Sequence, residues 1–205
     1  LKTPVGKSGR RETGSRVFGI DAVNEFDALT DDIYDYCEIL KIGVDTLIHE
    51  SGPSQIEINL SHGDPLALAD QAFMFKRAVR QVALKHGIHA TFMAKPYQGH
   101  PGSSMHIHQN LINYNSKKNI FSDDQGNNSD HFMNYIGGLQ NYLPDAMLFF
   151  APYVNSYRRF VIDASAPINT HWGYENRTVA FRVPTSKGPS RRVENRRAGA
   201  DTTPY

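Results

Sequence analysis

The sequence predicts an α+β fold with a largely antiparallel sheet. Two segments, 66–86 and 130–142, carry apolar residues at the spacing of an amphipathic helix. Shorter segments alternate apolar and polar residues with the two-residue period of a strand, most clearly 44–49 and 105–108. Helices and strands are interspersed without a strict β–α–β order, which favours antiparallel pairing.

Composition is that of an ordinary globular protein: 205 residues, 40% hydrophobic and 21% charged, with a net charge of +1. Nothing global indicates nucleic acid, although 2–16 and 187–197 are locally basic. Cys37 is the single cysteine, so no disulfide framework exists and a cytoplasmic location is expected. We find no signal peptide and no apolar run that would span a membrane. The chain opens on Leu1 rather than Met, and we expect it to be a fragment.

In the first half of the chain, 1–16 is expected to be a loop or arm and 17–25 a strand. Thr30 is expected to cap a helix over 31–40, and a strand follows over 44–49. Another strand should begin near Gln55. Asp64 followed by Pro65 is a strong start for the helix over 66–86, which Gly87 closes.

In the second half, strands are expected over 88–94, 105–108, 168–174 and 178–183. Ser129 or Asp130 should cap the long helix that follows the polar turn at 123–128, and Pro144 should kink or end it. No internal repeat and no domain linker is evident.

The stretch Gly102-Ser-Ser-Met-His-Ile-His108 is the centre of the chemistry. Strand alternation puts His106 and His108 on one face, and the small residues before them let the backbone approach an anion or a bulky group. Ordinary core or surface histidines are the alternative explanation of this motif taken alone.

Two carboxylates lie on either side of a break at Gly52-Pro53. Glu50 and Glu57 would face opposite sides of an unbroken strand, but the break lets both return to one side. Close carboxylates repel unless a cation lies between them, and Mg²⁺ and Mn²⁺ prefer oxygen ligands. Two solvent-facing glutamates are the plain alternative.

Arginines gather near the end of the chain, where Arg192, Glu194 and Arg196 share a face by alternation. Arginine clamps carboxylates and phosphates through paired donors, although an exposed salt-bridge ladder is the simpler explanation. Arg177 and Arg182 are five residues apart, so both serve one pocket only if Arg177 lies in a turn or a bulge intervenes. Carboxylates, a histidine and arginines together suit phosphoryl transfer to or from a carboxylate. A metal-dependent phosphohydrolase would use the same groups.

These motifs in this order resemble the catalytic domain of glutamine synthetase. The resemblance rests on His-Glu at 49–50, Gln-Ile-Glu at 55–57, Lys-Pro at 95–96, Gly-Ser-Ser-Met-His-Ile-His at 102–108, Asn-Ser-Tyr-Arg-Arg at 155–159, Asn-Arg-Thr at 176–178 and Arg-Arg-Val-Glu-Asn-Arg at 191–196. It implies a curved, largely antiparallel sheet backed by helices. Residues 1–205 would form one partial catalytic domain, without the family's N-terminal β-grasp domain, one early glutamate ligand and the C-terminal helices.

The resemblance also implies a role for each motif. Metal ions, Mg²⁺ or Mn²⁺, would be held by Glu50, Glu57, His106 and Glu194. His108 and Asn110 would lie near ATP and Gly102 near glutamate. Arg159 would grip the glutamate carboxylate, with Arg177, Arg182 and Arg196 around the transferring phosphoryl group.

The implied activity is an ATP-dependent glutamate–amine ligase in nitrogen metabolism, and the amine is the open point. Glutamine-forming members carry a flap glutamate where this chain has Ser165, which resembles the γ-glutamylpolyamine branch and favours an organic amine such as putrescine. Another base is then needed, and Asp163 is a candidate. Glutamine synthetase proper and a non-catalytic binding or regulatory protein are the alternatives. The family assembles as a homo-oligomeric ring with sites between subunits, so we expect the isolated piece to be inactive, with no nucleic-acid or membrane partner.

Overall fold

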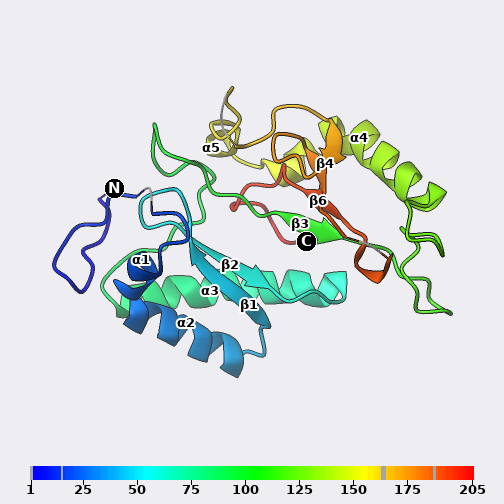
Figure 1. Ribbon diagram of the computed structural model, residues 1–205. Coiled ribbons are helices and arrows are strands. Elements are labelled where there is room, and N and C mark those ends of the chain that lie inside the picture. Colours follow the sequence, from blue (N-terminus) through cyan, green and yellow to red (C-terminus); the bar gives the residue numbers. More distant parts are fainter. Residues whose placement is uncertain (1, 15, 163–164, 187) are drawn as a thin grey trace. The chain divides into compact units, whose positions relative to one another are not determined.

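The computed structural model describes residues 2–14, 16–162, 165–186 and 188–205, and its fold is α+β (Figure 1). The chain divides into two compact units. The first comprises 1–92, 96–101 and 203–205, and the second comprises 93–95 and 102–202. Each unit has its own sheet and its own hydrophobic core. The predicted class is confirmed, but the strands form two sheets rather than one.

In the first unit, β1 (Val44–His49) and β2 (Ile56–Leu60) form an antiparallel pair. The predicted strand over 44–49 is therefore confirmed, and the second strand begins one residue after Gln55. Ile48 lies opposite Glu57 and His49 opposite Ile56. This register fixes the positions of the two candidate carboxylates.

Helix α3 (Pro65–Lys85) begins where its sequence signals place it. The Asp64 carboxylate accepts hydrogen bonds from the backbone N–H groups of Leu66 and Ala67, both at 3.1 Å. Gly87 follows the helix with φ +70°, a conformation that glycine adopts without steric cost. The helix packs with α2 (Asp27–Ile39) into a core made by Leu29, Ile33, Cys37, Ile42, Val82 and Ala83.

Three predictions for this part of the chain are wrong in detail. The segment 17–25 contains a short helix, α1 (Ile20–Asn24), in place of a strand. Helix α2 begins at Asp27, so Thr30 lies inside it and its hydroxyl donates to the Asp27 carbonyl at 2.9 Å. The segment 88–94 forms no strand; the Ile88 N–H donates to the Ala83 carbonyl at the end of α3, at 3.0 Å.

The sheet of the second unit has four strands in the order β3-β6-β5-β4. These are β3 (Ile107–Gln109), β4 (Trp172–Tyr174), β5 (Phe181–Val183) and β6 (Val193–Asn195). Three-residue strands replace the longer ones predicted over 168–174 and 178–183. The β3/β6 and β5/β6 pairs are antiparallel, while β4 and β5 are parallel. Two further short helices are α5 (Val154–Tyr157) and the 3₁₀ turn η1 (Gly188–Ser190).

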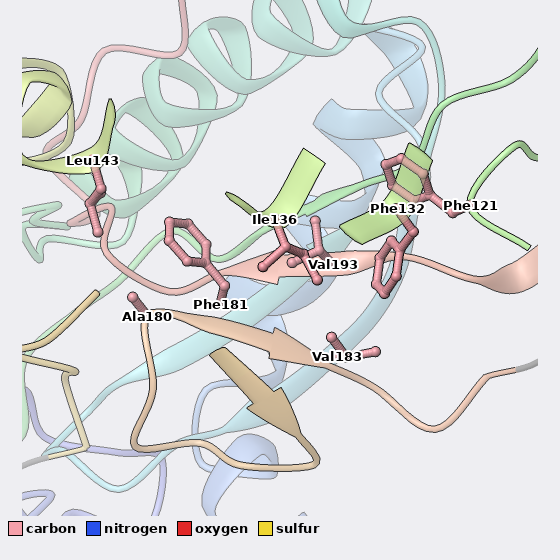
Figure 2. Packing of buried hydrophobic residues seen from close by; sticks show 8 residues of the cluster. All are labelled: Phe121, Phe132, Ile136, Leu143, Ala180, Phe181, Val183 and Val193. Carbon is pink, nitrogen blue, oxygen red and sulfur yellow. The ribbon is translucent and has the colours of Figure 1, made fainter. Parts of the chain in front are cut away.

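Helix α4 (Asp130–Phe150) supplies much of the core of this unit. The Ser129 hydroxyl accepts from the Phe132 backbone N–H at 3.2 Å, which confirms the predicted cap. Pro144 lies inside the helix, which continues to Phe150, so the proline does not end it. Figure 2 shows the buried side chains between α4 and the strands, with Phe132 beside Phe121. They are Phe121, Phe132, Ile136, Leu143, Ala180, Phe181, Val183 and Val193. Among the described residues, every helix is too short or too polar to cross a bilayer.

Candidate active site

Glu194 is the centre of a charged cluster in the second unit. It lies in β6 between two neighbouring strands, opposite His108 of β3 and Arg182 of β5. Its side chain is 3% exposed, and its two oxygens accept hydrogen bonds from Arg182 Nη1 and Arg196 Nη1, each at 2.6 Å. A buried carboxylate needs such partners, because leaving it unpaired would be costly.

His106 completes this cluster from the segment before β3. Its Nδ1 lies 3.2 Å from Glu194 Oε1, and its Nε2 lies 3.0 Å from the Ser104 hydroxyl. Burial, reinforced by the positive charge of Arg196, lowers the pKa of His106 to about 3. The imidazole is therefore neutral near pH 7.

The ionisation of Glu194 is decided by opposing effects. Burial raises the pKa of this carboxyl, but the Arg182 hydrogen bond and the Arg196 charge outweigh burial and lower the pKa below its ordinary value. The cluster thus holds an ionised carboxylate beside a neutral imidazole. Both are the states in which these groups bind cations.

His108 lies on the same side of the sheet as His106, as the alternation predicted, because it is the cross-strand partner of Glu194. Arg192 Nε donates to His108 Nδ1 at 3.2 Å. Burial lowers the pKa of His108. Asn110 follows β3 directly and is exposed.

Arg159 lies in a second part of this unit, after α5. The residue is 4% exposed, and its Nη2 donates to the backbone carbonyls of Arg197 and Arg196. Burial and the nearby Arg197 charge lower its pKa to about 10. Gly102 packs against its stem: a Cβ at Gly102 would lie 2.7 Å from Arg159 Cγ. Only a glycine fits at 102 without a shift.

Arg177 lies in a turn, which is one of the two geometries that its spacing from Arg182 required. Its backbone carbonyl accepts from Arg196 Nε at 3.2 Å. In the described contacts, Arg177 is therefore linked to the Glu194 cluster by its backbone carbonyl. Arg182 and Arg196 are linked to it by their guanidinium groups, which donate to the Glu194 carboxylate.

Glu50 and Glu57 belong to the first unit, on the β1–β2 hairpin. The Glu50 backbone N–H donates to the Gln55 carbonyl at 2.8 Å, so the antiparallel register continues one step beyond His49 and Ile56. Residues opposite each other share a face, as do residues two apart in one strand. Glu50, opposite Gln55, therefore shares a face with Glu57. The predicted return of both carboxylates to one side agrees with this register.

The whole chain matches one family model. Residues 2–205 match the model described as "Glutamine synthetase, catalytic domain". The chain belongs to the glutamine synthetase catalytic-domain family.

Several family relatives are closely similar. The chain is 43% identical over 196 residues to gamma-glutamylputrescine synthetase PuuA of Escherichia coli (strain K12), covering 95% of this chain and 41% of that protein. It is 40% identical over 158 residues to glutamate–isopropylamine ligase of Pseudomonas sp, covering 76% and 34%. A solved structure titled "Apo GmaS without ligand" matches with a TM-score of 0.81 and 30% identity, covering 92% of this chain and 43% of that one. The chain thus spans about two fifths of the length of such relatives.

The carboxylates of this family member suit hard divalent cations such as Mg²⁺ and Mn²⁺, and the neutral imidazole beside Glu194 can also bind a metal ion. Glu194 is ionised and His106 neutral, while the glutamates of the hairpin share one face. A carboxylate has about four lone-pair positions, so the two guanidiniums and His106 Nδ1 beside Glu194 leave room for a further ligand. Within the described ranges, however, no three His, Cys, Asp or Glu side chains form a metal-binding group by themselves.

Three residues of this glutamine synthetase domain were not predicted from the sequence to have a special position. Glu175 forms an ion pair with Arg182 Nη2 at 2.7 Å, so the same guanidinium pairs with both Glu175 and Glu194. The Arg197 guanidinium lies 4.3 Å from the centre of the Phe160 ring and donates to the Pro167 carbonyl. Glu12 is a buried acid in the N-terminal loop. Glu12 is the single acid within 1–16, among basic and small residues, and this is the one sequence feature that could have indicated a specific position for it.

Proposed function

We propose that the protein is an ATP-dependent glutamate–amine ligase that forms a γ-glutamyl amide, and that its amine is organic, such as putrescine. Family membership over residues 2–205 carries the proposal. It is supported by two relatives whose names specify putrescine and isopropylamine as the amine. The arginine-rich cluster around Glu194 and the neutral His106 suit the same chemistry.

In the proposed reaction, the γ-carboxylate of glutamate attacks the γ-phosphorus of ATP, and ADP leaves. The amine then attacks the acyl carbon, loses a proton, and expels inorganic phosphate. Phosphoryl transfer depends mainly on positioning and on neutralising charge. Arginines supply both, because their charge persists at neutral pH and their paired donors fit phosphate and carboxylate.

The proposed roles follow the position of each residue. Arg159, with Gly102 against its stem, holds the glutamate carboxylate. Arg177, Arg182 and Arg196 surround the transferring phosphoryl group. His108 and Asn110 lie beside the nucleotide.

Four residues are proposed as cation ligands. Glu50 and Glu57 would hold one Mg²⁺ or Mn²⁺, and His106 with Glu194 would hold another. Bound cations neutralise the triphosphate and orient its γ-phosphate.

Ser165 supports an organic amine over ammonia. It is exposed and stands where glutamine-forming members carry a flap glutamate. A serine hydroxyl neither attracts ammonium as a carboxylate does nor accepts its proton well. Asp163, the candidate base, lies outside the described residues.

The same proposal covers the whole protein and its setting. We infer a homo-oligomeric ring in which a small N-terminal domain from a neighbouring subunit completes each site. The protein would act in the cytoplasm, in nitrogen and polyamine metabolism. Its substrates would be ATP, glutamate and the amine.

The test is glutamate-dependent phosphate release from ATP by the full-length protein with Mg²⁺ or Mn²⁺. Putrescine should raise the rate more than ammonium does, and mass spectrometry should find the γ-glutamyl amide. Equal or better turnover with ammonium would support glutamine synthesis, to which a 40% identical relative named type-1 glutamine synthetase 2 from Dictyostelium discoideum also points. Binding of ATP and Mn²⁺ without turnover for any amine would support a regulatory protein, and phosphate release without glutamate a phosphohydrolase.

A further inference from the structure

Glu12 is a buried acid for which the proposed reaction has no use. Its side chain is 5% exposed, although most of the surrounding 2–16 segment is exposed. Acids are rarely buried to this extent without specific partners. Its main chain is also anchored: its N–H donates to the Pro4 carbonyl at 3.1 Å, and its carbonyl accepts from the Thr3 hydroxyl at 2.6 Å.

The Glu12 carboxylate holds the turn that connects β1 and β2. Its Oε2 accepts from the Ser54 backbone N–H and, at 3.1 Å, from the Ser54 hydroxyl. Its Oε1 accepts from the Gly14 N–H at 2.7 Å. Hydrogen bonds to an ionised acceptor are roughly twice as strong as neutral ones. A single carboxylate thus joins the N-terminal loop to the hairpin turn.

The turn needs this support because its backbone is strained. Ser54 has φ +55°, a left-handed conformation that is unfavourable for a residue with a side chain. Gly14 lies so close to the turn that a Cβ on it would be 2.9 Å from Pro53 N. Both hydrogen bonds to Glu12 Oε2 come from Ser54, the strained residue of this turn.

The turn determines where Glu50 is held. After the turn, the Gln55 carbonyl accepts from the Glu50 N–H, and this bond sets the register that puts Glu50 and Glu57 on one face. His49, which is 1% exposed, extends the link. Its Nδ1 donates to the Glu50 carbonyl at 2.7 Å, while its Nε2 lies 3.8 Å from Glu12 Oε1. Glu12 is therefore hydrogen-bonded to one end of the segment that carries Glu50 and lies beside the other.

We propose that Glu12 is a positioning residue for the cation held by Glu50 and Glu57: by clamping Ser54 and facing His49, it fixes the turn that sets the spacing of the two carboxylates. This inference rests on the proposed function, which makes those glutamates cation ligands. Groups that orient metal ligands without touching the metal change metal affinity by about 10- to 100-fold when mutated. Glu12 acts through the main chain, so we expect an effect of about 10-fold, at the lower end of that range.

The chain offers a matched control for this test. Glu25 accepts from the Ser8 N–H at 3.1 Å, so it also ties down the N-terminal loop, but its described contacts do not include the hairpin turn. Glu12→Gln is nearly isosteric, yet an amide has one acceptor oxygen and would present its NH₂ group to the N–H of Gly14 or Ser54. Glu25→Gln makes the same chemical change away from the turn.

The experiment measures Mn²⁺ binding to the full-length protein without ATP or glutamate, by titration calorimetry, together with the thermal midpoint of each variant. Glu57→Gln identifies the Mn²⁺ binding step that belongs to the hairpin. Glu12→Gln should weaken that step about 10-fold, and Glu12→Gln/Glu57→Gln should be no weaker than Glu57→Gln alone. Glu25→Gln should bind Mn²⁺ like the wild type.

Each outcome decides something. A folded Glu12→Gln protein with wild-type Mn²⁺ affinity overturns the inference and leaves the proposed function intact. Unchanged Mn²⁺ binding in Glu57→Gln removes the cation role of the hairpin and, with it, both proposals for this site. If Glu12→Gln does not fold, Glu12→Asp carries the test, because it keeps the charge but is one methylene shorter, so its carboxylate no longer holds the Ser54 and Gly14 N–H groups together. It should weaken the same Mn²⁺ binding step while Glu25→Asp does not, and equal affinities for these two variants would overturn the inference.

Discussion

Ser165 is the residue at which the proposed preference for an organic amine is tested most directly. Ser165→Glu restores a carboxylate that attracts ammonium and accepts its proton. The ratio of kcat/KM for ammonium to that for putrescine should therefore rise by on the order of 100-fold, the size of a general-base contribution. Glutamate-dependent phosphate release with each amine measures the ratio. Ser165→Gln is the matched control, since it adds the bulk without the charge, and an equal rise in both variants would contradict a role for the carboxylate.

Gly102 is a second residue with a defined local effect. In Gly102→Ala the new Cβ would lie 2.6 Å from the Ala94 carbonyl oxygen and 2.7 Å from Arg159 Cγ, so Arg159 must move. Because small misplacements of a positioning group reduce rates by up to about 100-fold, kcat/KM for glutamate should fall by on the order of 10-fold or more. Steady-state kinetics with varied glutamate measures this.

The control for Gly102→Ala is Gly137→Ala on α4, where an added Cβ meets nothing within 4 Å. Alanine is the better helix former, so this variant should keep wild-type kinetics and gain slightly in stability. A Gly102→Ala protein with unchanged glutamate kinetics would show that Arg159 does not need its present position.

Local spacing predicted part of the site at the residue scale. Alternation placed Arg192, Glu194 and Arg196 on one face, and the structure joins Arg196 to Glu194 directly. Glu12 was missed because its burial depends on Ser54, 42 residues away. The partners of Arg159 lie 37 and 38 residues along the chain. Contacts at such separations leave no periodic signal.

At the scale of elements, the sequence was most informative where side chains bond to nearby backbone. Asp64, Pro65 and Gly87 fixed both ends of α3, because capping is a local interaction. The segment 88–94 alternates as a strand would, yet it forms none, and the strand predicted over 17–25 is instead the short helix α1. Alternation shows that one side of a segment faces a core, but a strand also needs a partner backbone.

The packing of α4 gives a stability prediction for a whole element. Phe132 is fully buried beside Phe121, with ring centres 5.0 Å apart, whereas Phe149 of the same helix is 64% exposed. Phe132→Ala should lower the free energy of unfolding by about 3–5 kcal/mol, because it removes apolar burial and leaves a cavity. Phe149→Ala is the matched control and should cost less than about 1 kcal/mol. Urea unfolding of both variants measures the difference, and equal losses would mean that α4 does not anchor this core.

At the scale of the whole molecule, the fold class could be predicted from the sequence, but the division of the strands between two sheets could not. The antiparallel β3/β6 and β5/β6 pairs agree with the α+β expectation, while the parallel β4/β5 pair does not follow from any local pattern. Nor does the separation of β1 and β2 into a sheet of their own. Pairing between distant segments is decided by packing over the whole chain, and a short stretch of sequence contains no information about that packing.

The stability of both units depends on pH, because each unit contains a carboxyl group whose pKa is lowered in the folded state. Asp32 is one in the first unit, where the Lys85 and His86 hydrogen bonds lower its pKa. Glu175 is one in the second, where the Arg182 hydrogen bond and the Thr185 backbone N–H lower its pKa to about 2 from an ordinary 4.5. Between about pH 2 and pH 4.5, Glu175 is therefore more often protonated in the unfolded state than in the folded state. Stability must fall as the pH falls through that window.

Glu175→Gln tests this directly. The stabilisation from Glu175 is complete above about pH 4.5 and is lost as the pH falls towards about 2, the folded-state pKa. The variant should thus be less stable than the wild type near neutral pH, and the two should converge as the pH approaches 2. Urea unfolding along a pH series measures this, and repeating it at high salt should shrink the difference, since Glu175 is exposed and its charge is screened. A stability difference that stays constant with pH would show that the ion pair with Arg182 contributes nothing through its charge, and that the loss in the variant comes from packing alone.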